Sequence, residues 1–343
     1  MIPLLAHTPE TLHAALHAEG PGVPLAACRR AFHDLVGKGL PGTETRDGLS
    51  KASIRALEAS CTWALPEIET TVVDDFDKSV RYLFRLADGE RVEAVRIPLL
   101  KPGRFSVCLS SQVGCAMGCV FCATGRLGLS RNLATEEIIG CFLRVRADCP
   151  GRVSGAVFMG QGEPFHNYDA VLQAAEILCH PNGGAIAAEN ITISTVGVVP
   201  SIHRYAEERR RFRLIISLHS AIQSRRDQLV AVSRKWPLPS LAEAIRAYAN
   251  VAPGRVTVAY TLVSGVNTGA DEAEALAALL GDLPLRINLI DVNDTTGEFA
   301  QAPDAERRRF MDLLQPLRVP IVRRYSVGAA QNSACGMLAS VTP

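Results

Sequence analysis

Most of the chain, from Arg104 onward, alternates short apolar runs with longer segments of helical periodicity. The strand-like runs are RFSVCLS, VSGAVFMG, NITISTVG, RLIISLH, RVTVAYTL, LRINLI and VPIVRRY, and patterns such as TEEIIGCFLRVRAD and YDAVLQAAEILCH lie between them. Strict alternation of this kind predicts a parallel sheet with crossover helices. The sheet is a partial barrel, a full barrel or a doubly wound sheet. In all three arrangements, binding and catalytic sites lie at the carboxyl ends of the strands.

The first hundred residues have a different pattern. Three helical segments, at 8–20, 24–39 and 49–61, precede two alternating runs that flank Asp88-Gly89, a strong hairpin signal. Thr8 is suited to cap the first helix, Pro9 to begin it and Gly20 to end it. We therefore predict an accessory domain at 1–100, with helices and then a β-hairpin, and a core domain at 101–343.

Composition limits the classes of protein that the chain can belong to. The 36 basic and 35 acidic residues give a net charge of +1, so a basic face for nucleic acid would have to be local. The N-terminus does not resemble a secretory signal, and no apolar stretch is long enough to span a bilayer. A cytoplasmic protein with reduced cysteines is expected, in which clustered cysteines indicate metal binding or catalysis.

Four of the ten cysteines fall within residues 107–122. Cys115, Cys119 and Cys122 are spaced C-x3-C-x2-C, directly after the first expected strand of the core. A structural zinc ion normally takes four protein ligands, and no fourth ligand stands at the right spacing. Three thiolates suit a [4Fe–4S] cluster with one open iron, shielded on one side by Phe121. The alternative is a chance cluster of buried core cysteines.

The spacing and its context resemble the radical S-adenosylmethionine (SAM) superfamily. This resemblance implies that the open iron binds SAM, and that an electron from the cluster cleaves SAM to a 5′-deoxyadenosyl radical. It implies a partial (β/α)6 barrel with an N-terminal helical accessory domain and a β-hairpin extension. An electron donor such as a flavodoxin or ferredoxin system is also implied.

Further motifs resemble one branch, the RlmN/Cfr family of RNA adenine methyltransferases. These motifs are CLSSQVGCAMGCVFCATGRLGLSRNLATEEIIG, FMGQGEPFHNYDAV, ITISTVGVVP, SLHS, RVTVAYTLVSGVN, INLIDVN and SACGMLA. They follow the order of the family and, with the N-terminal module, extend the resemblance over nearly the whole chain. The family implies a monomeric enzyme that methylates C2 or C8 of an adenosine, in ribosomal RNA or in transfer RNA.

The resemblance also assigns residues to SAM. In GQGEP, Gly162 lets the backbone approach a ligand closely, and Glu163 can accept a hydrogen bond from the SAM ammonium. Small polar groups at the ends of other strands match the family's contacts to the SAM carboxylate and ribose. The full set of expected SAM contacts is Gly162, Glu163, Ser194, Ser217, Leu218, His219 and Asn293.

Two cysteines and one carboxylate match the family's catalytic positions. Cys335, near the C-terminus, matches the cysteine that one SAM methylates and whose S-methyl group then loses a hydrogen atom to the radical from a second SAM. Cys108 matches the cysteine that releases the covalent adduct by forming a disulfide with the methyl carrier. Glu93 resembles the assigned proton acceptor. Without the resemblance, Glu93 reads as a surface carboxylate of a hairpin strand.

The chain departs from the family near the expected substrate entrance. Residues 329–332 replace an acidic stretch, Met337 replaces a glutamine, and the basic tail is missing. Basic residues form runs at 209–213, 224–227, 233–236, 307–309 and 323–324. Most of them lie either on solvated helix faces or, together with Arg126 and Arg131, in a local phosphate-contacting patch. Two alternatives stay open: the same chemistry on a small molecule or peptide, and a non-enzymatic iron–sulfur redox sensor that binds RNA.

Overall fold

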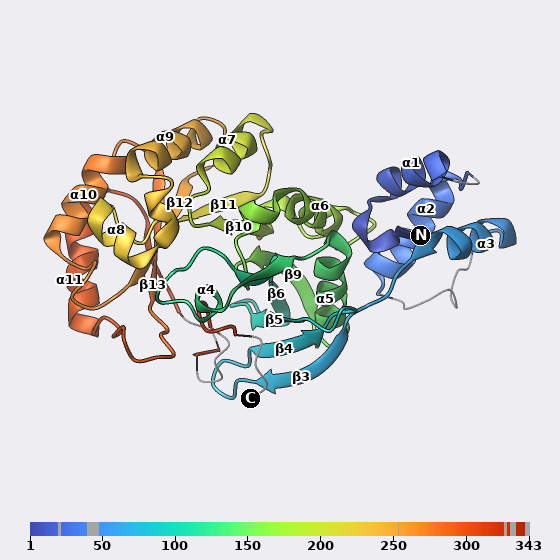
Figure 1. Cartoon of the computed structure of the whole chain (residues 1–343), viewed down its shortest axis with the longest axis horizontal. Helices are drawn as coiled ribbons and strands as arrows, with labels where there is room; N and C mark the ends of the chain where they lie inside the picture. The colour runs from blue at the N-terminus through green and yellow to red at the C-terminus, as the bar shows by residue number, and fades with distance from the viewer. Residues whose placement is uncertain (20–21, 40–47, 253, 326–327, 330–333, 340–343) are drawn as a thin grey trace.

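The computed structural model describes residues 1–19, 22–39, 48–252, 254–325, 328–329 and 334–339, so the interpretations of Gly20 and of 330–332 lie outside the described residues. A ten-stranded sheet runs through the molecule in the order β14-β13-β12-β11-β10-β9-β6-β5-β4-β3 (Figure 1). All seven expected core strands are present, and each pairs in parallel with its neighbour. They are β6 (Arg104–Leu109), β9 (Arg152–Phe158), β10 (Ile191–Thr195), β11 (Arg213–Ser217), β12 (Val256–Leu262), β13 (Leu285–Asp291) and β14 (Ile321–Arg324).

Helices connect these strands and cover the sheet. Their apolar faces pack on strands whose side chains are buried on both sides, as in β12 and β13, which explains the continuous apolar runs in the sequence. The connections are α5 (Thr135–Ala147), α6 (Tyr168–Cys179), α7 (Val199–Glu207), α8 (Gln223–Leu229), α9 (Leu238–Ala249), α10 (Ala270–Leu280) and α11 (Asp304–Leu314). Short 3-10 turns are η3 (Pro164–Asn167), η4 (Ala188–Asn190), η5 (Ala231–Arg234) and η6 (Gln315–Leu317). The expected partial (β/α)6 barrel is confirmed, with β14 as an added strand.

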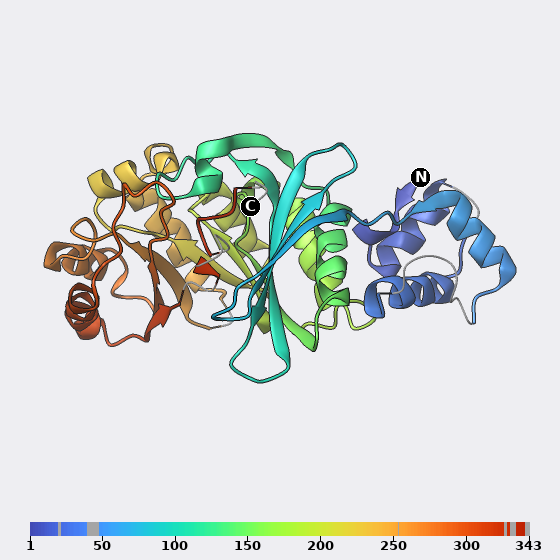
Figure 2. The ribbon, with the colours of Figure 1, turned by 90° about the horizontal axis from the view of Figure 1, so that it is seen from below.

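An antiparallel extension continues the same sheet beyond β6. The expected hairpin is formed by β4 (Val80–Arg85) and β5 (Arg91–Pro98). A third strand, β3 (Glu67–Val73), was not predicted from the sequence and forms the outer edge. Ion pairs of Glu67 with Arg85 and Glu69 with Arg91 lie along β3. Such charges are typical of an edge strand. Figure 2 shows the extension crossing in front of the barrel strands.

The N-terminal helices form a group at one side of the barrel (Figure 1). They are α1 (Pro9–Glu19), α2 (Leu25–Phe32), continued by a π-helical turn η2 (His33–Gly37), and α3 (Lys51–Ser60). The Thr8 hydroxyl accepts a hydrogen bond from the Thr11 amide, as expected of a helix cap. The first 3-10 turn, η1 (Leu4–Ala6), packs on α5, and β1 (Ile2–Pro3) pairs with β2 (Cys61–Thr62). The division at residue 100 stays a prediction.

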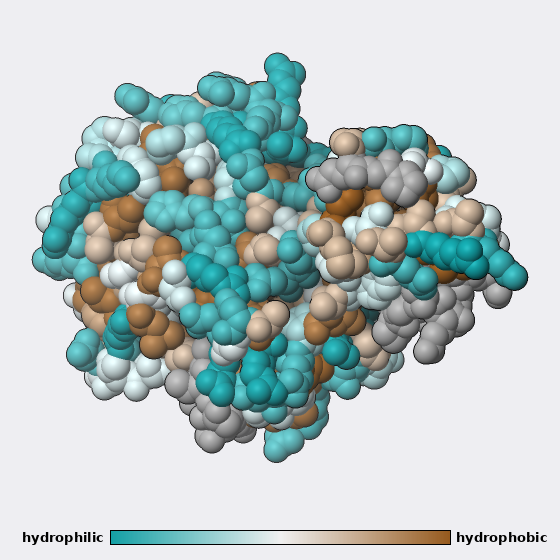
Figure 3. All heavy atoms as spheres, turned by 45° about the vertical axis from the view of Figure 1, so that its right-hand side comes forward, coloured by the Kyte–Doolittle hydropathy of each residue, from teal (hydrophilic) through white to brown (hydrophobic). Residues whose placement is uncertain are grey.

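Among the described residues, no helix is both long and apolar enough to cross a membrane. On the face drawn in Figure 3, hydrophobic side chains form separate patches among hydrophilic ones.

Candidate active site

The three clustered cysteines lie on a loop that is bonded to the segment at the end of α8. Cys115 ends β7 (Gln112–Cys115), which pairs with β8 (Gly128–Asn132), while Cys122 immediately precedes α4 (Ala123–Leu127). In between, the Val120 amide donates to the Leu229 carbonyl at 3.1 Å, and Cys119 forms a β-bridge with Val230. Cys115 and Cys119 are buried and Cys122 is half-buried.

The three thiols affect one another electrostatically. Burial raises the pKa of Cys115 to about 12, with smaller contributions from Glu163 and Cys122. Burial also raises the pKa of Cys119 well above its usual value, and the charges of Cys122 and Cys115 add to the effect. Burial disfavours the charged form of each thiol. Three thiolates at these positions would therefore need a strongly positive metal centre to stabilise them.

The surroundings fit an iron–sulfur cluster. Cys115 and Cys119 belong to an apolar shell formed by Met117, Phe121, Leu229, Val230, Val263 and Val292. Such a shell limits solvent access to a cluster. No group of three His, Cys, Asp or Glu side chains in the described ranges converges on a single metal ion. Thiolates of a cubane bind different irons and so lie farther apart than the ligands of one ion, which agrees with this finding.

The C-terminal loop that carries Cys335 is hydrogen-bonded directly to the cysteine loop. The Ala123 amide donates to the Gly336 carbonyl at 2.7 Å, and the Thr124 hydroxyl donates to the Leu338 carbonyl at 2.6 Å. The Asn293 amide group donates to the Cys335 carbonyl at 3.2 Å. These bonds hold Cys335 beside Cys122. The residue as a whole is exposed, but burial of the Cys335 thiol raises its pKa.

Cys108 and Cys335, which are distant in sequence, meet in the fold. Cys108 lies on β6 opposite Val95 of β5, and these two residues pack with Leu338 of the C-terminal loop. Burial raises the pKa of Cys108, and the proximity of Cys335 raises it further. Cys108, which is not one of the three clustered cysteines, therefore packs against the C-terminal loop.

Glu93 is buried and ion-paired. It lies on β5 two residues from Val95, so both side chains point to the face that carries Cys108. Its carboxylate accepts a hydrogen bond from the Arg81 guanidinium at 2.9 Å, and only 1% of the residue is exposed. The reading of Glu93 as a surface strand carboxylate is therefore wrong, because the antiparallel extension lies across the barrel and covers it.

Gly162 and Glu163 lie beyond the end of β9, next to the cysteine loop. Gly162 has φ +99, and a Cβ atom there would lie 2.6 Å from the Gln112 Cβ, so only glycine fits. Burial raises the pKa of Glu163 to about 7, although hydrogen bonds from the Val196 amide, the Phe165 amide and the Thr195 hydroxyl oppose this. Glu163 also raises the pKa values of Cys115 and Cys119, which places its carboxylate near the expected cluster.

The other expected SAM contacts lie at the ends of neighbouring strands. The hydroxyl groups of Ser194 and Ser217 are 3.1 Å apart across β10 and β11. Leu218 is fully buried, and its amide donates to the Ala259 carbonyl of β12. His219 follows with φ +61, and burial lowers its pKa to about 3, with Arg226 adding to the shift. The imidazole ring is therefore neutral, and it packs edge-on against Phe121.

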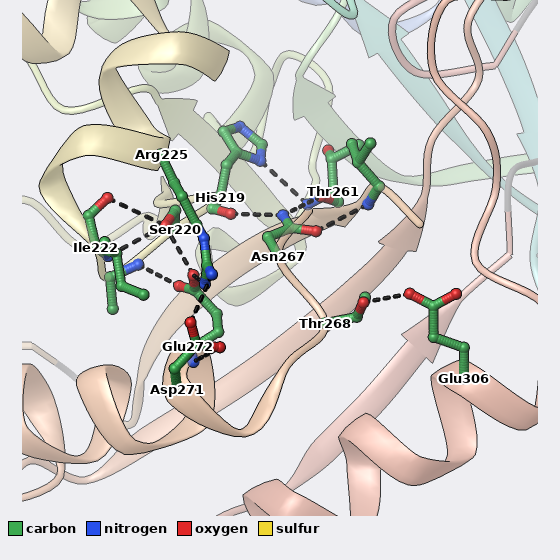
Figure 4. A network of polar contacts seen from close by, with 12 residues as sticks. His219, Ser220, Ile222, Arg225, Thr261, Asn267, Thr268, Asp271, Glu272 and Glu306 are labelled. Carbon is green, nitrogen blue, oxygen red and sulfur yellow. Dashed lines mark hydrogen bonds and ion pairs between the residues drawn. The ribbon is translucent and has the colours of Figure 1, made fainter. Parts of the chain in front are cut away.

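A polar network fixes the unusual backbone of His219 (Figure 4). The Asn267 side chain donates to the carbonyls of His219 and Thr261, at 2.7 and 2.8 Å, and the Thr261 amide donates to the His219 Nδ1. The buried Glu272 carboxylate accepts from the hydroxyl of Ser220 at 2.9 Å. A left-handed non-glycine residue persists only when its surroundings determine it strongly, as they do here.

Two site residues were not predicted from the sequence. Gln161 accepts from the Glu93 amide, and its own carbonyl accepts from the amides of Ser111 and Gln112, so it joins the extension to the cysteine loop. Its position inside GQGEP was the available signal. Arg226 is buried and donates to the carbonyls of Leu218 and Val196, joining β10 to β11.

The expectation that the basic runs form a phosphate-contacting patch is wrong for two of their members. Arg226 is 1% exposed, and Arg307 is buried in an ion pair with Asp291. Arg126 and Arg131 are partly exposed, and they pair with Asp294 and with Asp88 and Glu137. Periodicity does not separate a buried arginine from a solvated one, because both occur on helix faces.

A parallel barrel with three cysteines after its first strand defines the class of radical SAM proteins, and the Radical SAM superfamily model matches residues 109–280. "Probable RNA methyltransferase Anae109_4379" of Anaeromyxobacter sp. (strain Fw109-5) is 48% identical over 324 residues, covering 94% of this chain and 95% of that protein. "Probable dual-specificity RNA methyltransferase RlmN" of Heliobacterium modesticaldum is 41% identical, over 76% of this chain and 70% of that protein.

A solved structure of a radical SAM methyltransferase from Sphaerobacter thermophilus superposes with a TM-score of 0.89 at 34% identity, and covers 99% of this chain and 100% of that chain. The chain belongs to the RlmN/Cfr family of radical SAM methyltransferases. The expected family, fold class and SAM-dependent enzymatic activity are thereby confirmed. Membership also implies a [4Fe–4S] cluster and SAM as cofactors.

Proposed function

We propose that this enzyme methylates an amidine carbon, C2 or C8, of an adenosine in RNA, with ribosomal RNA as the first candidate and transfer RNA as the second. The observation that carries this proposal is the convergence of Cys335, Cys108 and the cysteine loop from distant parts of the chain. The relatives named as RNA methyltransferases support RNA as the substrate.

Cys115, Cys119 and Cys122 would hold the cluster, which when bound would supply the electron that cleaves SAM. The polar groups at the strand ends, from Gly162 to Asn293, bind and orient SAM beside the cysteine loop. His219, which is neutral, and Glu163 are both buried on that side of the site. Two SAM molecules are used in each turnover, one as methyl donor and one as radical source.

Cys335 carries the methyl group. Its thiolate takes a methyl from the first SAM, and after loss of one hydrogen atom the S-methylene carbon bonds to the adenine carbon. This route suits an electrophilic carbon, which cannot attack a methyl sulfonium as a nucleophile. The position of Cys335 beside Cys122 supports the role.

Release of the product requires a base and a thiol. Glu93, which is ion-paired with Arg81, accepts the proton from the adenine carbon. The adduct radical also gives up one electron, which the oxidised cluster would take back. The Cys108 thiol, whose pKa is raised by burial, then loses its proton as its sulfur attacks the Cys335 sulfur. An S–S bond forms as the S–C bond breaks, the carbon keeps the electron pair and takes a proton, and the disulfide is later reduced by an external thiol.

Turnover with methyl-labelled SAM tests the proposal. The reconstituted enzyme is supplied with a reductant and with total RNA, and in parallel with extract metabolites. Label on adenosine is expected, together with a mass increase of one methyl on Cys335. Label only in small molecules would contradict the RNA substrate, and turnover by Cys335→Ala would contradict the carrier.

A further inference from the structure

A cavity of about 300 Å³ lies beside the Cys335 loop and borders the proposed SAM site, since the expected SAM contact Asn293 is one of its lining residues. It forms at the carboxyl end of β13, where Asp291 and Asn293 line it. The Asn293 side chain donates to the Cys335 carbonyl, so the cavity is separated from the methyl carrier by one side chain. Its volume is at the lower end of the range for ligand sites.

Two exposed aromatic side chains line this cavity. Phe76 comes from the loop between β3 and β4 and is 94% exposed, and Tyr325 directly follows β14 and is 74% exposed. The Phe76 loop is ordered by Asp74, whose buried carboxylate accepts from the amides of Phe76 and Asp77. Two aromatic rings so exposed at one cavity indicate a binding surface.

The acidic groups of the cavity are already satisfied by the protein. Asp291 is ion-paired with Arg307 at 3.1 Å and with Arg323 at 2.9 Å. The Asp77 carboxylate accepts from the Gly328 amide at 2.6 Å, which ties the Phe76 loop to the C-terminal segment. The Arg323 guanidinium lies 4.8 Å from the Tyr325 ring centroid. A polyanionic chain that approaches the rings therefore meets Asp291 with its charge compensated by two arginines, and Asp77 with its charge retained.

We propose that this cavity binds an unpaired base of the RNA substrate, adjacent to the target adenosine, by stacking on Phe76 and Tyr325. The proposal rests on the proposed function. Chemistry on a base carbon requires the target to leave its stack, which costs free energy and exposes its neighbour. Aromatic side chains recover part of this by stacking with the exposed base, and they do so with little sequence preference.

Kinetics on an RNA fragment test the role of the rings. Tyr325→Ala and Phe76→Ala are each expected to raise KM about tenfold and to leave kcat unchanged, while Tyr325→Phe stays near wild type. Leu100→Ala is the matched control, because Leu100 is fully exposed in the turn after β5 and does not line the cavity. Unchanged KM values in both alanine variants would overturn the proposal.

Salt dependence separates stacking from phosphate contact. Stacking releases no counterions, so the slope of log KM against log salt is expected to stay the same in Tyr325→Ala. The slope is expected to fall in Arg324→Ala, because Arg324 directly precedes Tyr325 and lies close enough to Cys335 to affect its pKa. A reduced slope in Tyr325→Ala would overturn stacking. Methylation of Cys335 in the absence of RNA serves as the check that each variant is folded and binds SAM.

A binding assay distinguishes failure of this proposal from failure of the proposed function. Tyr325→Trp fluorescence, measured against the unchanged background of Trp63 and Trp236, is expected to be quenched by single-stranded RNA and not by a duplex of the same sequence. Quenching with no methyl transfer to RNA by the wild type would contradict the function alone. Methyl transfer without quenching would contradict the stacking proposal, as would quenching by an aromatic peptide but not by RNA.

Discussion

Arg81 and Glu93 form an ion pair in the interior of the protein, with 2.9 Å between the guanidinium nitrogen and the carboxylate oxygen. The Arg81 side chain is 7% exposed and that of Glu93 is fully buried. Both belong to the antiparallel extension, on the face that carries Cys108. A buried pair strongly destabilises a fold when one partner is removed, because the other charge stays uncompensated.

Arg81→Met is therefore expected to lower the free energy of unfolding by about 3–5 kcal/mol. The double variant Arg81→Met, Glu93→Leu is expected to recover most of this loss, because no unpaired charge remains. Urea unfolding of the cluster-free protein measures both. If Arg81→Met were as stable as the double variant, the loss of Arg81 would not leave a costly charge at Glu93, and this explanation of the pair would be wrong.

The bond from the Thr124 hydroxyl to the Leu338 carbonyl keeps the Cys335 loop against the cysteine loop. Thr124→Val preserves the shape and removes the bond, so turnover is expected to fall roughly fivefold, which corresponds to about 1 kcal/mol. Reductive cleavage of SAM in the absence of substrate is expected to be unchanged. Thr135→Val is the control, since its hydroxyl bonds to the Ala170 carbonyl in α6. Equal effects of the two variants would argue against a role in positioning Cys335.

Gly162→Ala is expected to weaken SAM binding severely and to destabilise the protein by about 1–3 kcal/mol. The added methyl would meet the Gln112 side chain and the Ser111 hydroxyl, each within 2.7 Å, at a φ of +99. Gly265→Ala has the backbone strain without the collision, since φ is +70 and nothing lies within 4 Å. Equilibrium dialysis with SAM compares the two, and similar affinities would mean that close approach at Gly162 is not required.

Stability at low pH is expected to depend on Glu208. Burial would raise the pKa of Glu208, but hydrogen bonds from Tyr168, Arg210 and Arg204 outweigh it and lower the pKa to about 2. The carboxylate therefore contributes stability that is present above its ordinary pKa of 4.5 and is lost as the pH falls toward 2.

Glu208→Gln is expected to lower the free energy of unfolding at pH 7 by about 1–2 kcal/mol and to flatten its decline below pH 4.5. Urea unfolding over this pH range is the measurement. Asp169→Asn is the control, because this partner of Arg204 has a side chain that is 79% exposed, and such pairs contribute little. If the free energy of unfolding of Glu208→Gln declined with pH as in the wild type, the Glu208 carboxylate would not be the source of the lost stability.

Local patterns in the sequence predicted most strands of the fold and the main motifs of the site. Alternation of apolar runs with helical patterns predicted all seven parallel strands, because strands buried on both faces must be apolar throughout. The C-x3-C-x2-C spacing and the strand-end motifs indicated the SAM machinery, because ligands of one cluster come from a single short loop. The edge strand β3 was missed, since its alternation of exposed and half-buried residues, many of them polar, is a weak signal.

The resemblance implied that Cys108 and Cys335 meet, but the contacts that bring distant groups together were decided only by the tertiary structure. Cys335 reaches Cys122 and Cys108 through hydrogen bonds to Ala123, Thr124 and Asn293, none of which leaves a trace in local periodicity. Burial of Glu93, and of Arg226 among basic neighbours, likewise depends on elements that pack across the chain. A sequence pattern reports the residue types that an element needs, whereas distance and exposure arise only when elements far apart in the chain pack together.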